Sequence, residues 1–314
     1  MKILITGGLG YLGSHLTEWF FGREGWEVVV LTRPGPLRPS AAPCRILQAD
    51  IASAEDLRQT LDEPFDYCIH AASVNDGFVP GYAEAALRVN AGGTRNLLEA
   101  LQGRGLKRLL YLSTIHVYGT GSGLIDERRA PAPVNDYALT HWFAEEYVRA
   151  FHRRHAMPYA ILRLTNVYGA PRHRESTKWY LVLNDLARMA HERKEIVLKS
   201  NGLARRDFLW VGDACRFIEA LLSAPDAACQ TVNVGAGRTR AVLELAEMVS
   251  RVHERRYGVS VAIRTNEEDK TSYPETSVDC RLLQSIVNEE IHERFEDEVG
   301  RIFDLLDGGA PCRV

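Results

Sequence analysis

Short apolar runs alternate with amphipathic stretches through the first half of the chain. Runs suited to buried strands lie at 2–6, 27–32, 44–48, 66–70, 107–112 and 159–164. Apolar side chains recur at helical spacing over 11–24, 53–62, 82–102 and 136–155. Strands that alternate with helices in this way are typical of a parallel sheet covered on both faces. The pattern therefore predicts an α/β fold with a doubly wound parallel sheet.

A glycine-rich turn joins the first strand to the first helix. It reads Thr6-Gly7-Gly8-Leu9-Gly10-Tyr11-Leu12-Gly13. Such glycines permit a tight turn, a close backbone approach to a pyrophosphate and tight packing of helix on strand. Glycine turns of this kind are common, but the free N–H groups of the following helix also suit phosphates. The strand–turn–helix context predicts a Rossmann-type dinucleotide site at Gly7, Gly10, Tyr11, Leu12 and Gly13.

The pattern becomes less regular after about residue 166. It predicts a helix near 177–192, strands near 195–199 and 207–210, helices near 211–223 and 239–254, and a partly helical tail over 280–308. We therefore expect a smaller C-terminal α/β lobe, with a ligand cleft between the two parts. The expected division is a dinucleotide-binding domain over 1–165 and a substrate-binding lobe over 166–314. The chain is expected to return to the first domain near 205–235.

Composition narrows the class of protein. The 314 residues are 25% charged and 46% apolar, and the formal net charge is −3. Nothing in this balance favours nucleic acid or an acidic membrane surface as a partner. No apolar run approaches the ~18 residues of a membrane helix, no secretory signal precedes the first strand, and the six cysteines lack metal-ligand spacing. We expect a cytoplasmic protein with reduced thiols and no metal.

Further segments follow the glycine turn in a recognisable order. They are Ala49-Asp50-Ile51, His70-Ala71-Ala72, the run from Asn90 to Ala100, the run from Ser113 to Gly119, Tyr137, the run from Arg163 to Gly169, Arg206-Asp207-Phe208, and the run from Asn233 to Gly237. Over about residues 1–280 the chain resembles the extended short-chain dehydrogenase/reductase family, in its NAD-dependent epimerase/dehydratase branch. The resemblance implies an NAD(P)-dependent enzyme that modifies nucleotide-activated sugars.

The resemblance also adds residues to the cofactor site. It implies that Asp50 reaches the adenine ring beside Ile51, and that Ala71 and Ala72 lie near the dinucleotide. An aspartate that caps the next helix is the alternative interpretation of Asp50.

The end of the second strand departs from the NAD pattern. An acidic residue there would hold the ribose 2′-hydroxyl, whereas this chain has Thr32 followed by Arg33. The planar donors of Arg33 suit a 2′-phosphate, although a loop arginine can simply be solvated. We therefore expect Thr32 and Arg33 at the cofactor, and we favour NADP over NAD.

Catalysis in the family rests on a tyrosine, which Tyr137 matches. The resemblance implies that Tyr137 exchanges a proton with a sugar hydroxyl while hydride moves between sugar and nicotinamide, and that Thr114 bonds the same oxygen. His141 replaces the family lysine four residues after the tyrosine. Histidine is only partly charged near neutral pH, and burial discourages its charge. Three alternatives stay open: His141 acts as the cation and holds the nicotinamide ribose, His116 contributes as a base, or the redox cycle is slow or lost.

The substrate side is described by the same resemblance. The implied contacts are Thr114, His116, Asn166, Lys178 and Arg206, and the forked cation of Arg206 suits a diphosphate. We expect Asp207 to orient Arg206 or to cap the helix near Val211. Lys270 is the cation available near the position of a second family arginine.

Related 4,6-dehydratases carry an Asp-Glu pair directly after the threonine. This chain has Ile115 and His116 there, and an isoleucine transfers no proton, so dehydration is disfavoured. The favoured hypothesis is an enzyme that acts at C4 of a nucleotide-activated sugar, as a 4-epimerase or a 4-ketoreductase. The alternative is a catalytically weak NAD(P)-binding sensor or scaffold. A homodimer built from helices 82–102 and 136–155 is expected.

Overall fold

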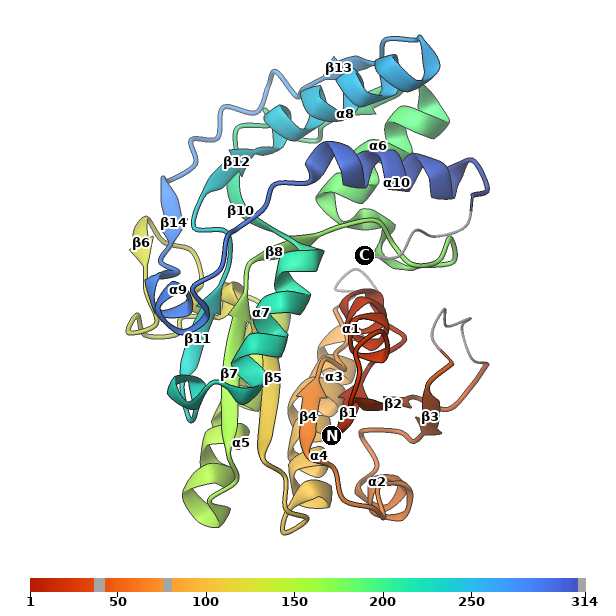
Figure 1. The fold of residues 1–314 in the computed structure, drawn as a ribbon. Coiled ribbons are helices and arrows are strands. Elements are labelled where there is room, and N and C mark those ends of the chain that lie inside the picture. Colours follow the sequence, from red (N-terminus) through yellow and green to blue (C-terminus); the bar gives the residue numbers. More distant parts are fainter. Residues whose placement is uncertain (37–42, 76–80, 310–314) are drawn as a thin grey trace.

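A seven-stranded sheet forms the larger part of the protein, in the order β11-β7-β5-β4-β1-β2-β3, and every neighbouring pair is parallel. The computed structural model describes residues 1–36, 43–75 and 81–309. Figure 1 shows the sheet and its helices below, with a smaller lobe above them. The strands of the sheet are β1 (Lys2–Thr6), β2 (Glu27–Thr32), β3 (Arg45–Gln48), β4 (Tyr67–His70), β5 (Arg108–Thr114), β7 (Tyr159–Leu164) and β11 (Thr231–Val234).

Helices cover both faces because successive strand side chains point to opposite faces. Ile3 and Ile5 of β1 pack with Phe217 in one apolar cluster, whereas Leu4 between them packs with Leu97 in another. The helices of the first face are α1 (Tyr11–Phe21), α7 (Val211–Ser223) and α9 (Arg281–Val287). Those of the second face are α2 (Ala54–Thr60), α4 (Gly93–Leu101) and α5 (Asp136–His155).

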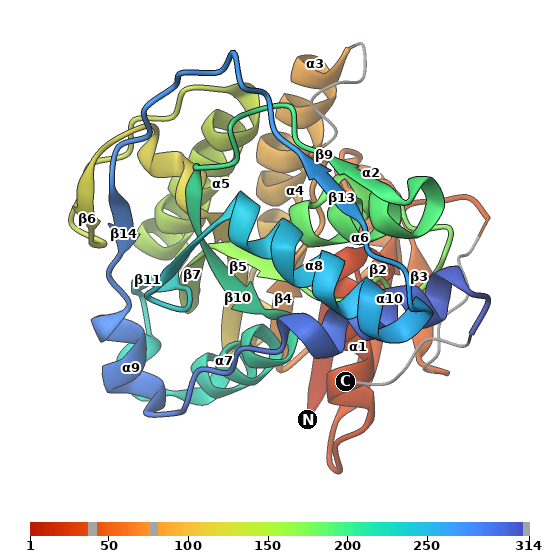
Figure 2. The same cartoon turned by 90° about the horizontal axis from the view of Figure 1, so that it is seen from above.

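Within the described residues the lobe contains three helices that pack around one apolar core. They lie above the sheet in Figure 1 and in front of it in Figure 2, which looks down from above. They are α6 (Val182–Arg193), α8 (Val242–Tyr257) and α10 (Phe295–Leu306). A three-stranded sheet connects the lobe to the larger part; it consists of β8 (Asn166–Tyr168), β10 (Arg205–Trp210) and β12 (Thr239–Ala241). Two further pairs are β9 (Glu195–Val197) with β13 (Ala262–Arg264), and β6 (Gly123–Ile125) with β14 (Thr276–Val278).

The predicted α/β sheet is confirmed. All six strands predicted in the first half are present, with ends that differ by at most two residues. The seventh strand, β11, was not predicted because it is short and carries a polar residue, Asn233, at its centre. Asn233 is fully buried, and its side-chain amide bonds the carbonyls of Ile125 and Asp279.

The prediction of one continuous helix over 82–102 is wrong. The chain forms α3 (Tyr82–Ala86), then a π-helical segment over Leu87–Gly92, then α4. The widened turn carries the buried Asn90, whose side chain accepts from the N–H of Val74 at 2.7 Å and donates to its carbonyl at 3.0 Å. Asn90 thereby holds the loop after β4 in place. Single π-helical turns inside a helix are frequent at functional sites of proteins.

Smaller corrections concern the second half. The helix predicted at 239–254 begins only at Val242, because residues 239–241 form β12 against β10. The segment predicted as a helix near 177–192 starts with a 3₁₀ turn, Lys178–Tyr180, before α6. The predicted helical tail contains α9 and α10.

The cysteines and the helices bear on two further expectations, those of reduced thiols and of no membrane-spanning helix. The thiols of Cys68, Cys215, Cys229 and Cys280 are free, and Cys312 lies outside the described residues. No helix in the described ranges combines the length and the apolar character that crossing a membrane requires.

Candidate active site

A cleft of about 430 Å³ opens at the carboxyl ends of the parallel strands. Its walls come from the segments after β1, β4, β5 and β7, at residues 7–13, 71–75, 112–116 and 164–168, and from the lobe at 178–184 and 206–208. The chain crosses to opposite sides of β1 when it forms β2 and β4. Ligands of open α/β sheets bind at such a switch point, outside the carboxyl ends of the strands.

The glycine turn has the shape that a phosphate group needs. Gly7 has a φ of +68°, and a Cβ there would lie 2.8 Å from the Cα of Ala72. A Cβ on Gly13 would lie 2.1 Å from the carbonyl oxygen of Gly7. Gly10 caps α1 without a side-chain hydrogen bond, so the first N–H groups of α1 stay available to an anion. The turn therefore fits the pyrophosphate of a dinucleotide.

The residues predicted for the adenosine half lie at the ends of β2 and β3, beside the cleft rather than in it. The Arg33 side chain is exposed and makes no hydrogen bond or ion pair within the described residues. The Asp50 carboxylate accepts from the N–H of Ala52 at 3.0 Å and lies 3.5 Å from the Arg88 guanidinium. Ser53, and not Asp50, caps α2, so the alternative interpretation of Asp50 as a helix cap is wrong.

Tyr137 and Thr114 meet at the floor of the cleft. Asn135 caps α5 by accepting from the N–H of Ala138, which places Tyr137 in the first turn of that helix. Thr114 is the last residue of β5, and its side chain lines the cleft near the Tyr137 phenol. Burial raises the pKa of Tyr137, and the interaction with Thr114 only partly opposes the shift. The phenol is therefore protonated at neutral pH.

His141 lies one helical turn after Tyr137, with the two ring centroids 4.6 Å apart and nearly perpendicular. Its Nδ1 lies 2.7 Å from the hydroxyl of Tyr111 on β5. Its Nε2 is buried and has no hydrogen-bond partner within the described residues, although His141 lines the cleft. Burial, with a smaller contribution from His116, lowers the pKa of His141 to about 4 against the opposing effect of Glu145. The ring is therefore neutral at neutral pH.

Glu145, one further turn along α5, was not among the predicted residues. Its fully buried carboxylate accepts from Ser113 at 2.6 Å, from Arg163 at 2.9 and 2.6 Å, and from Arg149 at 2.9 Å. Burial alone would raise the pKa of Glu145, but these bonds and charges lower it overall. The spacing of Tyr137, His141 and Glu145 by four residues would have placed all three on one helix face.

The predicted substrate residues His116, Asn166, Lys178 and Arg206 all line the cleft. Arg206 makes no hydrogen bond or ion pair within the described residues, so its guanidinium is open to a ligand. Lys178 already bonds Asn75 and, at 2.9 Å, the hydroxyl of Tyr180. No acidic side chain is found among the described residues that line the cleft, which suits an anionic ligand.

The His116 ring lies beside Tyr137, at 6.0 Å between centroids. Loss of hydration in the cleft lowers its pKa, and the nearby charge of Arg206 lowers it further. His116 is therefore neutral at neutral pH, and its ring can accept a proton or donate a hydrogen bond.

The expected roles of Asp207 are wrong. Its buried carboxylate accepts from the backbone N–H of Ala236 at 2.9 Å instead of holding Arg206 or capping α7. Asp207 thus joins β10 to the turn after β11. Lys270 is not among the residues that line the cleft, and its ammonium donates to the carbonyl of Glu267.

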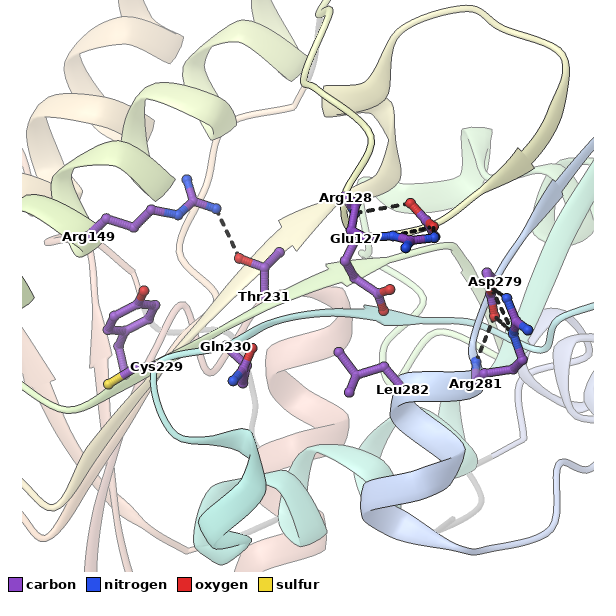
Figure 3. A pocket seen from close by; sticks show the side chains of 11 residues that line it. Glu127, Arg128, Arg149, Cys229, Gln230, Thr231, Asp279, Arg281 and Leu282 are labelled. Carbon is purple, nitrogen blue, oxygen red and sulfur yellow. Dashed lines mark hydrogen bonds and ion pairs between the residues drawn. The ribbon is translucent and has the colours of Figure 1, made fainter.

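A second, more open hollow of about 580 Å³ lies along the outer strand β11 (Figure 3). Its arginines are engaged within the hollow or beside it: Arg149 with Glu145 and Thr231, Arg281 with Asp279, and Arg128 with Asp126. None of the predicted site residues lines it. The cleft at the glycine turn is therefore the candidate active site.

Comparison with known proteins agrees with this geometry. The model of the NAD dependent epimerase/dehydratase family matches residues 3–235. An uncharacterized UDP-glucose epimerase of Bacillus subtilis (strain 168) is 24% identical over 334 residues, which cover 98% of this chain and 100% of the relative. A dTDP-glucose 4,6-dehydratase of Streptomyces niveus is 31% identical over 265 residues, which cover 79% of this chain and 76% of the relative.

A solved structure shares the whole fold. The crystal structure of UDP-glucuronic acid 4-epimerase from Bacillus cereus, in complex with UDP-glucuronic acid and NAD, superposes with a TM-score of 0.82 at 22% identity. The superposition covers 98% of this chain and 99% of the other. At this identity the likeness concerns the fold alone.

Proposed function

This chain belongs to the NAD dependent epimerase/dehydratase family, and we propose that it acts at C4 of a nucleotide-activated sugar, as a 4-epimerase or a 4-ketoreductase. One observation carries the proposal. Tyr137 and Thr114 share one cleft with the glycine turn and with His141, whose buried Nε2 has no hydrogen-bond partner within the described residues. A proton-transfer group and a dinucleotide cradle are thereby within reach of the same ligand.

The cofactor would be held from several elements. The turn from Gly7 to Gly13 would bind the pyrophosphate, Asp50 and Ile51 would lie at the adenine, and Ala71 and Ala72 would lie along the dinucleotide. His141 Nε2 would bond the nicotinamide ribose. The bound dinucleotide supplies an acceptor or a donor of hydride.

The residues of the chain handle the proton and the substrate. Tyr137 takes the proton from the sugar hydroxyl or returns it, and Thr114 holds the same oxygen. Arg206 is the open cation for a diphosphate. Lys178 would lie at the wall of the sugar site, and its bonds to Asn75 and Tyr180 support that placement. The side-chain nitrogen of Asn166 already donates to the backbone carbonyl of Asp207. Its side-chain oxygen is left to accept a hydrogen bond from a sugar hydroxyl.

Dehydration at C6 is not part of the proposal, although one relative is named a 4,6-dehydratase. That reaction needs an acid and a base beside the threonine, and this chain has Ile115 and His116 there. A half-buried isoleucine transfers no proton, so a water molecule cannot be expelled by the pair.

NADP is the proposed coenzyme, in preference to NAD. The end of β2 carries Thr32 in place of an acidic residue, and the Arg33 guanidinium next to it is exposed and uncommitted within the described residues. An uncommitted, forked cation suits a 2′-phosphate. A dissociable NADPH favours net reduction of a 4-keto sugar over epimerisation.

A catalytically weak NAD(P)-binding sensor or scaffold is the second candidate. The observation that favours it is the neutral His141 in the place of a permanently charged lysine, since a neutral ring does not lower the pKa of Tyr137. Residues 1–165 would then bind the dinucleotide, and the lobe over 166–314 would bind the sugar nucleotide, without rapid turnover. A homodimer through α4 and α5 is proposed for either function.

Incubation with UDP-, GDP-, dTDP- and CDP-hexoses and both coenzymes separates the two candidates. Nicotinamide absorbance reports net oxidation of the sugar, which is the reverse of the ketoreductase reaction, and product chromatography reports epimerisation. Turnover of any one sugar supports the enzyme. Tight coenzyme binding with no turnover supports the sensor or scaffold, and failure of both coenzymes to bind contradicts both.

A further inference from the structure

The His141 ring is surrounded by five groups that ionise or carry charge. Tyr111 lies on β5, Tyr137 and Glu145 lie on α5, His70 ends β4, and His116 follows β5. Only Tyr111 among them forms a hydrogen bond with the ring, at 2.7 Å from Nδ1. The orientation of His141 therefore depends on one phenol.

The other groups near His141 are committed elsewhere. The Glu145 carboxylate is occupied by Ser113, Arg149 and Arg163. The two ring nitrogens of His70 lie 2.7 Å from the Thr6 hydroxyl and 2.9 Å from that of Thr94. The usual partner of a functional histidine, a carboxylate, is thus replaced here by a neutral phenol.

The protonation state of the Tyr111–His141 pair follows from counting donors. Burial raises the pKa of Tyr111 and lowers that of His141, so both groups are neutral at neutral pH. The pair then holds two hydrogens, one on the phenol oxygen and one on a ring nitrogen. The Tyr111 hydroxyl has no second hydrogen-bond partner within the described residues.

Two arrangements are possible. If the Tyr111 hydroxyl donates to Nδ1, then Nε2 carries the ring hydrogen, and this hydrogen is the one buried polar group of the pair without a partner in the free protein. If Nδ1 carries the hydrogen and donates to the phenol oxygen, both the phenol hydrogen and the bare Nε2 are left buried without a partner. Each buried unsatisfied polar group is costly, so the first arrangement is favoured.

We propose that Tyr111 is a positioning residue that fixes His141 as the Nε2–H tautomer, so that Nε2 donates to a ribose hydroxyl of the bound dinucleotide. The inference rests on the proposed function for the identity of the acceptor, and on the geometry of the free protein for the tautomer. It gives His141 the donor role of a lysine without the charge. Coenzyme binding is then supported, whereas activation of Tyr137 is not.

The tautomer is measured in the protein without any coenzyme. Selective ¹⁵N labelling of histidine and nitrogen-detected NMR distinguish a protonated from an unprotonated ring nitrogen, and a His141→Gln variant identifies the signals of His141 by their loss. We expect an unprotonated Nδ1 and a protonated Nε2 throughout the neutral range. A protonated Nδ1 in the wild-type protein would overturn the inference without any variant.

The Tyr111→Phe variant tests the cause. It keeps the ring of the phenol and removes only the hydroxyl, so we expect a mixture of the two His141 tautomers and coenzyme affinity weakened by roughly fivefold. The matched control is Tyr118→Phe, because Tyr118 is equally buried and its hydroxyl bonds Asn233 instead of His141. The control leaves both the tautomer and the affinity unchanged.

The outcomes separate this inference from the proposed function. An unchanged tautomer and an unchanged coenzyme affinity in Tyr111→Phe overturn the inference and leave the function standing. Failure of the wild-type protein to bind either coenzyme in calorimetry overturns the function and the ribose contact together. The NMR result then still decides whether Tyr111 sets the tautomer.

Discussion

The Tyr137 phenol and the His141 imidazole contact each other edge to face, at 4.6 Å between centroids and 70° between planes. A T-shaped contact of this kind brings the two rings together without a hydrogen bond between them. His141 is neutral because burial lowers its pKa to about 4, so it supplies no positive charge beside the phenol. The pair therefore differs in electrostatics from a tyrosine next to a lysine.

The variant His141→Lys is expected to change how the rate depends on pH. A unit charge at about 5 Å, with an effective dielectric constant of about 20, favours the phenolate by roughly 3 kcal/mol, or roughly two pKa units. The rate of sugar oxidation needs the phenolate and so rises with pH. The pH at half-maximal kcat should fall by roughly two units in the variant. The measurement is the pH–rate profile of sugar oxidation, with the profile of the reverse reaction recorded as a check.

The control for this change is His141→Gln, which keeps a donor and adds no charge. We expect its profile to have the same midpoint as that of the wild-type protein. Identical profiles for the lysine and glutamine variants would show that charge at this position does not act on Tyr137. Thermal melts of both variants establish that they fold.

Replacement of Gly13 by alanine is expected to abolish coenzyme binding. Its Cβ would lie 2.1 Å from the carbonyl oxygen of Gly7, so the turn must open. Gly22 at the end of α1 is the matched control, because its φ is −74° and a Cβ there would meet nothing closer than 3.5 Å. Calorimetry should show affinity reduced at least about tenfold in Gly13→Ala and unchanged in Gly22→Ala; equal affinities would contradict the assignment of the turn.

The coenzyme preference depends on Arg33. Replacement by serine removes the one guanidinium at the end of β2 within the described residues, and a charge-assisted bond to a phosphate contributes about 1.5–3 kcal/mol. We expect NADPH to bind Arg33→Ser at least about tenfold more weakly, with NADH unaffected as the internal control. A wild-type protein that binds NADH more tightly than NADPH would refute the preference.

Regular patterns explain what could be predicted from the sequence. The parallel sheet could be predicted from apolar runs such as 27–32. The glycine turn could be predicted from the spacing of its glycines, because the backbone there leaves no room for a Cβ at Gly7 or Gly13. Tyr137, Thr114 and His141 lie together as expected, because Thr114 ends β5, and Tyr137 and His141 lie in the first two turns of α5 at the same edge of the sheet. These are local signals, and the topology brings them to one place.

Long-range polar contacts explain the features that could not be predicted from the sequence. The π-helical segment exists because Asn90 bonds the backbone of Val74, and Asp207 turns away from Arg206 because Ala236 offers a buried N–H. Neither partner is near in the sequence. The bond between Tyr111 and His141 joins a strand to a helix over 30 residues, and nothing in either local pattern announces it.

The proposed dimer depends on the outer face of α5. Phe143 and Tyr147 lie one turn apart there, and 37% and 38% of their surfaces are exposed. Glutamates at both positions would place charges in an apolar contact, so the double variant Phe143→Glu/Tyr147→Glu should be monomeric in analytical ultracentrifugation. Leu203→Glu, which changes an exposed leucine of the lobe, should keep the dimer; a wild-type protein that sediments as a monomer of 35.2 kDa contradicts the proposal.

Two buried histidines predict how stability changes with pH. Burial lowers the pKa of His70 to about 3 and that of His141 to about 4, whereas both titrate near ~6.5 in the unfolded chain. Between these values the unfolded chain takes up protons that the folded protein does not, so the free energy of unfolding falls as the pH falls below about 6.5. Each histidine should contribute roughly 3 kcal/mol to this loss by pH 4.

Protonation of carboxylates such as Glu145 also lowers the free energy of unfolding as the pH falls. The contribution of the histidine is therefore taken from the difference between the wild-type protein and a histidine variant. Urea titrations from pH 7 to pH 4 should show a shallower decline for His141→Gln than for the wild-type protein, by roughly 3 kcal/mol at pH 4. His155→Gln is the matched control, because His155 is exposed at the end of the same helix and its removal should leave the decline unchanged. Parallel curves for the wild-type protein and His141→Gln would mean that His141 titrates normally in the folded protein, and that the cleft admits water to its ring.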